Sequence, residues 1–195
     1  MNSIKIFSIL ILFFLSACVT LDPRPIEPRV TIAPLFEKNV LKRVGLYIQD
    51  NTRRVRQGGI RMVEDEFIRA IIEKGYTLAS RSDINLIKKE LKLQQSNVTE
   101  EAIAKKAKIL NVSGIIIVDI NKVDTQFIRS SHPTPRYRGY YITNVNISAR
   151  LISAELGRVV WISSHDGRYK MVNRTDGSEA LPPVAQIVAS GLPGK

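Results

Sequence analysis

The fold is decided by the stretch Gly-Ile-Ile-Ile-Val at residues 114–118 and by the longer stretch YITNVNISARLISAELGRVVWIS at residues 141–163. A continuous run of β-branched residues is typical of a strand that is buried on both faces of a sheet. The longer stretch alternates apolar and polar residues in its first half, which predicts a half-buried antiparallel strand. A turn at residues 155–157 then returns the chain into a partner strand over 158–163. The two stretches therefore predict a sheet with a long antiparallel hairpin.

The segments before and after these strands alternate between strand and helix patterns. Residues 43–49 predict a first strand, and apolar residues recur at helical spacing between Ile60 and Gly75. Residues 76–79 are short enough for a second strand. Further helices are expected to begin at Ser82 or Asp83, to begin at Thr99, and to cover Val184–Ala189. This order predicts an α/β fold, an α/β sandwich in which helices pack on a mixed sheet.

The N-terminus has the pattern of an export signal. Lys5 precedes an apolar run over residues 6–15, and Ser16 and Ala17 place small residues before a cleavage point. The run is shorter than the ~20 apolar residues that a spanning helix requires, so we do not expect it to anchor the protein. Residues 1–17 are therefore predicted to be a signal peptide.

The single cysteine of the chain, Cys18, follows this segment directly. The sequence Leu-Ser-Ala-Cys at 15–18 resembles the lipobox of bacterial lipoproteins, which implies that the Cys18 sulfur carries a diacylglyceryl group. More than one acyl chain gives a durable anchor, since each buried CH₂ contributes about 0.8 kcal/mol. Val19 follows, and the enterobacterial sorting pattern that this resembles implies the outer membrane, with the protein facing the periplasm. The alternative is an ordinary signal that leaves a free cysteine at the new terminus.

Residues 18–39 are expected to tether the folded domain to the membrane. Four of the nine prolines in the chain lie here, at positions 23, 25, 28 and 34. Proline fixes φ and removes a backbone donor, so this segment should be extended. The α/β domain is expected over residues 40–175, and residues 176–195 are expected to be a C-terminal tail with a short helix.

The residue composition excludes several classes of chemistry. One cysteine and two histidines, His132 and His165, are too few for disulfide frameworks or for zinc sites built from cysteine and histidine. Gly58 and Gly59 open a helix after a strand, but their neighbours match neither the dinucleotide-binding nor the P-loop pattern. The sequence contains no GxSxG elbow, and no spacing places a nucleophile beside His165. We therefore predict a protein that is not an enzyme and has no catalytic residue, cofactor or metal.

The formal net charge is +11, from 29 Lys and Arg against 18 Asp and Glu. Arginines gather in two segments expected to be loops, 50–59 and 125–139, and the candidate contacts with an anionic partner are Arg53, Arg54, Arg56, Arg136 and Arg138. The export signal separates the protein from cytoplasmic nucleic acid, so we expect lipid headgroups or acidic envelope components instead. The alternative is a solvated basic surface. The two prolines and three arginines of 125–139 make that loop unsuited to crossing the lipid bilayer.

Three stretches resemble the CsgG-type curli-secretion lipoproteins and their LpoB-like relatives, the activators of penicillin-binding proteins. They are VGLYIQDNT at 44–52 with EDEFIRAIIEKGYTLASRSDINLIKKELKLQQ at 64–95, AKILNVSGIIIVDINKV at 107–123, and VNISARLISAELGRVVWISS at 145–164. The resemblance covers residues 40–170 and implies a CsgG-like α/β sandwich, similar to anticodon-binding domains, rather than a specific activity. The chain departs from the family at Ser80, where Glu is usual before Arg81, and at Asp119, where a strand glycine is usual.

This resemblance implies a non-catalytic accessory factor for cell-envelope assembly or secretion. Its partner would be a peptidoglycan synthase or a secretion or assembly complex, held by protein–protein contacts. An alternative is a ring-forming structural subunit, a homo-oligomer within a curli-like secretion or surface-organelle complex. A third hypothesis, an enzyme that uses the loop arginines on an anionic substrate, would give His132 and His165 a role.

Overall fold

The structure is a computed structural model that describes residues 27–34, 36, 41–80, 82–86, 100–134, 137–171 and 177–194. The side chains at 130, 132–134, 137, 138 and 171 lie outside this description. Cys18, the predicted signal peptide and most of the predicted tether also lie outside the described residues. No helix in the described part of the chain is both long and apolar enough to cross a membrane.

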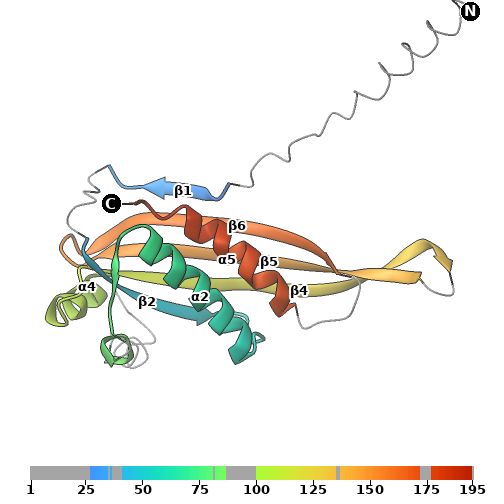
Figure 1. Ribbon diagram of the computed structural model, residues 1–195, viewed down its shortest axis with the longest axis horizontal. Coiled ribbons are helices and arrows are strands. Elements are labelled where there is room, and N and C mark those ends of the chain that lie inside the picture. The colour runs from blue at the N-terminus through green and yellow to red at the C-terminus, as the bar shows by residue number, and fades with distance from the viewer. Residues whose placement is uncertain are drawn as a thin grey trace, which may run out of the picture.

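A six-stranded mixed sheet forms the centre of the described structure, in the order β1-β6-β5-β4-β2-β3 (Figure 1). The strands are β1 (Arg29–Ile32), β2 (Arg43–Asp50), β3 (Thr77–Leu78), β4 (Gly114–Thr134), β5 (Tyr137–Ser153) and β6 (Arg158–Met171). The helices are α2 (Gln57–Glu73), α4 (Glu100–Ile109) and α5 (Leu181–Ser190), with the 3₁₀ helix η2 (Ser178–Ala180) and a helical turn at 82–86. β2 runs parallel to β3 and β4, and the other neighbours are antiparallel. The predicted α/β sandwich with helices on a mixed sheet is confirmed.

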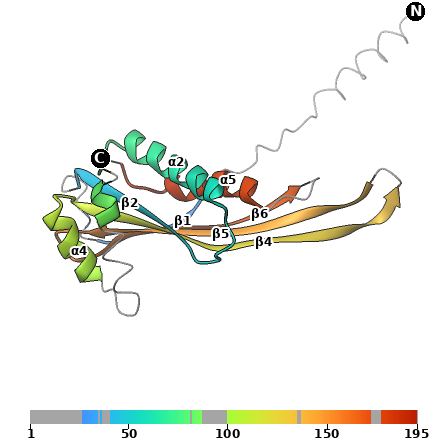
Figure 2. The same cartoon turned by 90° about the horizontal axis from the view of Figure 1, so that it is seen from below.

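Helices cover the two faces of the sheet to different extents (Figure 2). α2 and α5 lie side by side over one face, and the larger apolar core fills the space between them and the strands. Its largest fully buried side chains include Trp161, Phe67, Ile120 and Ile147. α4 and the turn at 82–86 cover the opposite face only near the β5–β6 turn, over a smaller core. Among the described residues, the remainder of that second face is free of helices.

The C-terminal segment, expected to be a tail, contributes to the larger core. In α5, Leu181, Val184 and Val188 are each 0% exposed against α2 and the sheet. The indole N–H of Trp161 donates a hydrogen bond of 2.8 Å to the Gly191 carbonyl, just after α5. The expected short helix is therefore present, and it completes the domain rather than following it.

Residues 125–139 were predicted to be a loop, and this prediction was wrong. β4 and β5 continue through this segment and stay paired in register as far as Arg129 and Gly139. The rings of Phe127 and Tyr141 lie 5.1 Å apart across the ladder, a contact that stabilises paired strands. Of the two prolines that suggested a loop, Pro133 lies inside β4, between the pair Arg129–Gly139 and the pair Thr134–Tyr137, where the register shifts, and Pro135 lies outside the described residues.

Two other segments join the sheet, contrary to the sequence predictions. Arg29–Ile32, inside the predicted tether at 18–39, forms β1 and pairs with residues 161–164 of β6. His165, expected in a polar segment after the strand, lies within β6 opposite Ile147. Both segments are strands because pairing along a sheet satisfies backbone groups that are otherwise left to water.

The helical turn at 82–86 is capped by Ser80 rather than by the predicted Ser82 or Asp83. The Ser80 hydroxyl accepts a hydrogen bond of 3.3 Å from the Asp83 backbone N–H and donates one to the Asp83 carboxylate, as in a capping box. The hydrogen bond from Ser80 lowers the pKa of Asp83 below its usual value. Arg43 of β2 adds to this effect through an ion pair of 2.7 Å, which also ties the turn to the sheet.

The role of α5 in the core can be tested at Leu181, which is 0% exposed. Leu181→Ala should lower the free energy of unfolding by about 2–5 kcal/mol, because apolar burial is lost and a cavity remains. Urea unfolding followed by circular dichroism measures the change. Ile109→Ala is the control, since Ile109 is 70% exposed in α4, and it should change stability by less than about 0.5 kcal/mol. Equal losses in the two variants would contradict a structural role for α5.

Candidate functional site

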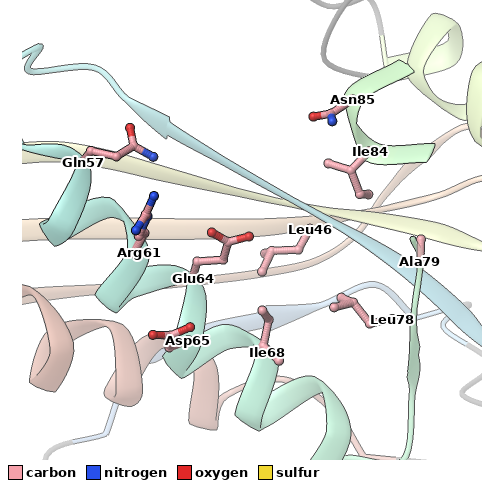
Figure 3. A pocket seen from close by; sticks show the side chains of 10 residues that line it. All are labelled: Leu46, Gln57, Arg61, Glu64, Asp65, Ile68, Leu78, Ala79, Ile84 and Asn85. Carbon is pink, nitrogen blue, oxygen red and sulfur yellow. The ribbon is translucent and has the colours of Figure 1, made fainter. Parts of the chain in front are cut away.

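A groove of about 450 Å³ lies at the outer edge of β2, between α2 and the helical turn at 82–86 (Figure 3). It is lined by Leu46, Gln57, Arg61, Glu64, Asp65, Ile68, Leu78, Ala79, Ile84 and Asn85. The apolar side chains come from β2, α2, β3 and the turn and converge on the floor, whereas the polar ones stand on α2 and on the turn. Most of the accessible lining is polar, and the apolar side chains supply the smaller part of it.

β2 leaves part of its outer edge without a partner strand. β3 pairs only with Arg43 and Val44, and the ladder on this side ends with the hydrogen bond of 2.8 Å from the Ala79 N–H to the Val44 carbonyl. Alternate residues of a strand direct their backbone groups to opposite sides, and the carbonyl of Arg43 is bonded on the β4 side. Leu46 and Ile48 therefore direct their N–H and C=O groups outward. Within the described ranges, no strand pairs with these groups.

A glycine lets the turn at 82–86 approach this edge closely. A Cβ atom at Gly45 would lie 2.7 Å from Cδ1 of Ile84, which is closer than real contacts allow. The side chain of Ile84 therefore packs directly over the backbone of β2. Leu46 and Ile84 are 7% and 9% exposed, so the floor of the groove is largely shielded from water.

α2 supplies the polar wall of the groove. Gln57, Arg61, Glu64 and Asp65 recur at helical spacing and share one side of the helix. Because α2 runs back alongside β2, Gln57 and Arg61 stand near the C-terminal end of that strand (Figure 3). The carboxylates of Glu64 and Asp65 lie farther along the groove. Its charge therefore changes from basic to acidic along its length.

The loop between β2 and α2 is organised by the carboxylate of Asp50. This carboxylate accepts hydrogen bonds from the Thr52 N–H at 2.9 Å, the Thr52 hydroxyl at 2.6 Å and the Val55 N–H at 2.9 Å. Burial favours the neutral acid, but the hydrogen bonds outweigh burial and hold the pKa of Asp50 below its usual value. Arg53 adopts a left-handed φ of 56°, which is uncommon for a residue other than glycine.

Three of the predicted contact residues, Arg53, Arg54 and Arg56, are exposed in this loop, at the end of the groove where α2 begins. Arg136 lies outside the described residues. Arg138 belongs to β5, but its side chain is not among those described. Only the first arginine cluster can therefore be placed beside the groove.

The strand register separates the two arginine clusters. Asp50, at the start of the first loop, pairs with Ile120, whereas the hairpin stays paired as far as Arg129 and Gly139. Nine residue steps along β4, from 120 to 129, separate these positions, or about 30 Å at ~3.3 Å per step. Arg129, the arginine of the second segment whose side chain is described, therefore lies away from the start of the first loop.

A row of hydrogen-bonded polar side chains crosses the open face of the sheet, and sequence reasoning missed it. Gln49 donates to Asn51 at 2.8 Å, Asn51 to Asn121 at 3.0 Å, Asn121 to Asn146 at 2.9 Å, and Asn146 to Asp166 at 2.8 Å. The polar positions along β5 were the available signal. The register between strands, which aligns these residues, cannot be read from any one strand.

Asp119, one of the departures from the resembled family, has a partner across the ladder. Nη1 of Arg150 donates to its carboxylate at 2.8 Å, and the Asp119 side chain is 9% exposed. A charge that is this buried requires such a partner. Burial raises the pKa of Tyr47, and the charge of Asp119 raises it further.

The described residues bring no metal-binding cluster together: no group of three or more His, Cys, Asp or Glu side chains there could hold an ion. His165 and Asp166 are neighbours in β6, so their side chains lie on opposite faces of the sheet. These two side chains are therefore not assembled into one site.

No family model matches the chain, and no curated protein matches it. Solved structures that are similar include a PelC dodecamer from Paraburkholderia phytofirmans, with 16% identity, a TM-score of 0.48, and coverage of 86% of this chain and 97% of that chain. Lipoprotein GNA1162 from Neisseria meningitidis has 16% identity, a TM-score of 0.46 and coverage of 75% and 97%. The LpoB C-terminal domain from Escherichia coli has 14% identity, a TM-score of 0.40 and coverage of 66% and 82%. The CsgG-like assignment stays a prediction, and we infer function from this chain's own residues.

The role of Asp50 in the loop predicts a pH dependence of stability. A carboxyl with a lowered folded pKa stabilises the fold above its unfolded pKa of about 3.9, and this contribution is lost as pH falls through the folded pKa. The free energy of unfolding, measured by urea titration between pH 6 and pH 2, should therefore fall less steeply in Asp50→Asn than in the wild type. Glu155→Gln, in the exposed β5–β6 turn, is the control and should keep the wild-type slope. Identical slopes in all three proteins would contradict the hydrogen-bonded loop.

Proposed function

We propose that the protein is an outer-membrane lipoprotein that faces the periplasm and acts without catalysis, as an accessory factor in envelope assembly or secretion that binds a protein partner. The lipobox-like segment that ends at Cys18 supports the membrane anchor. The described structure supports binding through exposed elements of the sheet.

The projecting β4–β5 hairpin is the observation that carries this proposal (Figures 1 and 2). β6 ends at Met171, opposite Tyr141, so β4 and β5 continue beyond that point as two strands alone. Such a ribbon is only marginally stable in water. Phe127 lies opposite Tyr141, at the base of this ribbon, and is 50% exposed, and the ammonium group of Lys170 lies 4.2 Å from the centre of the Tyr140 ring. An exposed aromatic side chain at the base of a projecting element suits contact with another protein.

A ring-forming structural subunit is the second candidate, and the two edges of the sheet favour it. The sheet ends in β1 on one side and in the short β3 on the other. Neighbouring copies could pair these edges head to tail, which closes into a ring when the rotation between copies permits. Mass measurement of the mature protein in detergent separates the candidates, because a monomer excludes the ring.

A photocrosslinking amino acid in place of Phe127 should capture a protein in intact envelopes, because this side chain stands exposed on the hairpin. The same replacement of Leu156 is the matched control, since Leu156 is 46% exposed in the β5–β6 turn at the other end of the sheet. Mass spectrometry of the purified adducts identifies what was captured. Lipid alone at position 127, or the same adducts at both positions, would argue against a partner-binding hairpin.

The anchor is tested by labelled palmitate. The wild-type chain should incorporate the label and remain in the outer-membrane fraction, whereas Cys18→Ser should do neither, because a hydroxyl does not replace the thiol in this modification. Incorporation into both chains, or into neither, would overturn the lipoprotein assignment.

A further inference from the structure

We infer that the groove beside β2 binds an extended peptide segment of a protein partner, which adds a strand to the open edge and places a carboxylate against Arg53 and Arg54. The inference rests on the proposed function in one respect, that the protein works through protein partners. The site lies beside β2, whereas the hairpin is formed by β4 and β5 on the other side of the sheet centre. The inference also specifies the chemistry of the occupant.

The backbone of β2 requires the occupant to be extended. Leu46 and Ile48 present N–H and C=O groups outward at the repeat of a strand, beyond the point where β3 stops pairing at Val44. Native sheets usually guard such an edge with proline, with charge or with a covering segment. Residues 45–49, Gly-Leu-Tyr-Ile-Gln, contain no proline and no charge. An added peptide strand satisfies these groups by the same pattern as the ladder itself.

The shape of the strand edge determines which side chains of the occupant meet the floor of the groove. The groove reaches around the strand edge, with Leu46 and Ile68 on the side of α2 and Ile84 on the opposite side. An extended peptide directs successive side chains to these two sides alternately. Leu46, Ala79 and Ile84 are already buried, so an apolar residue at alternate positions of the peptide can contact only the half-buried side chains of Ile68 and Leu78.

The charge along the groove specifies one end of the occupant. Arg53, Arg54 and Arg61 gather where β2 ends and α2 begins, and the N-terminus of α2 adds the positive end of its dipole. A carboxylate is favoured at this end and disfavoured farther along, beside Glu64 and Asp65. The carboxylate can belong to an acidic side chain or to the C-terminus of the partner, and the two sources are separable by amidation.

The test uses the mature chain in detergent and four fluorescein-labelled hexapeptides. Two have the sequence Val-Thr-Val-Thr-Val-Glu, one with a free and one with an amidated C-terminus, and two replace the Glu with Lys and carry the same two termini. Fluorescence anisotropy should show the tightest binding for the free acidic peptide. If that peptide keeps its affinity after amidation, the carboxylate that contacts the arginines is the Glu side chain. If it loses affinity, the carboxylate is the C-terminus. Equal affinity of all four peptides, or no binding, overturns the inference.

Two variants separate the charge from the groove. The double variant Arg53→Glu, Arg54→Glu should weaken binding of the acidic peptide by about tenfold and leave the amidated Lys peptide unaffected or bound more tightly, because the contact is electrostatic. Ile48→Pro removes an outward N–H, and Ile48→Ala is its matched control, which loses the side chain and keeps the N–H. The proline variant should bind about fivefold more weakly than the alanine variant. Equal binding by the two variants contradicts backbone pairing.

Amide hydrogen exchange in the wild-type chain tests the pairing even where a variant fails to fold. The N–H groups of Leu46 and Ile48 should exchange rapidly in the free protein and become protected when the acidic peptide is added. The N–H groups of Tyr47 and Gln49 face β4 and should be protected in both states. Protection of Leu46 and Ile48 without peptide overturns the inference, and a dependence of that protection on protein concentration identifies a second copy as the occupant. The crosslinking experiment at position 127 does not involve the edge of β2. If no peptide binds at β2, the hairpin contact can still be present, and if no protein is crosslinked at position 127, the peptide can still bind at β2.

Discussion

The parallel pairing of β2 with β4 is the constraint on which the rest of the structure depends. Ile115, Ile116, Ile117 and Val118 of β4 are 0–2% exposed where they lie beside β2. A strand buried in this way has to be flanked on both edges and covered on both faces, because its backbone groups and apolar side chains have no access to water. α2 and α5 cover one face, and α4 with the turn at 82–86 covers the other at the same level of the sheet. Where β4 leaves this covered region, its apolar run ends and polar and exposed aromatic residues begin.

Local patterns were sufficient to predict the elements whose signal lies within one segment, such as the buried run of β4 and the alternation along β5. They were not sufficient where pairing decides the structure. The prolines of residues 125–139 indicated a loop, but the hairpin there is held by cross-strand contacts such as that of Phe127 with Tyr141, which neither strand shows alone. β1 has four residues and is a strand because β6 offers it an edge. The burial of α5 likewise depends on α2, far away in sequence.

The candidate site likewise has one part that local sequence patterns predicted and one part that they did not. The arginines of the 53–56 loop were predicted as contact residues from their clustering, whereas the groove beside them was not. The groove exists because β3 stops after two residues and because Gly45 admits Ile84 over the backbone of β2. Neither cause is visible before the segments are brought together. The sequence alone also weighed both arginine clusters equally, and only the register of β2 and β4 shows that Arg129 lies about 30 Å along the sheet from Asp50, where the first loop starts.

The order of the strands keeps the proposed tether and the groove on different edges. The described chain after Cys18 begins at Glu27 and joins the sheet at β1, while the groove opens beside β2. Four strand spacings separate β1 from β2 in the order β1-β6-β5-β4-β2, or about 19 Å at ~4.8 Å each. The hairpin leaves along the strand direction, across the line between these edges (Figure 1). A lipid anchor, a peptide strand and a partner at the hairpin therefore do not compete for the same surface.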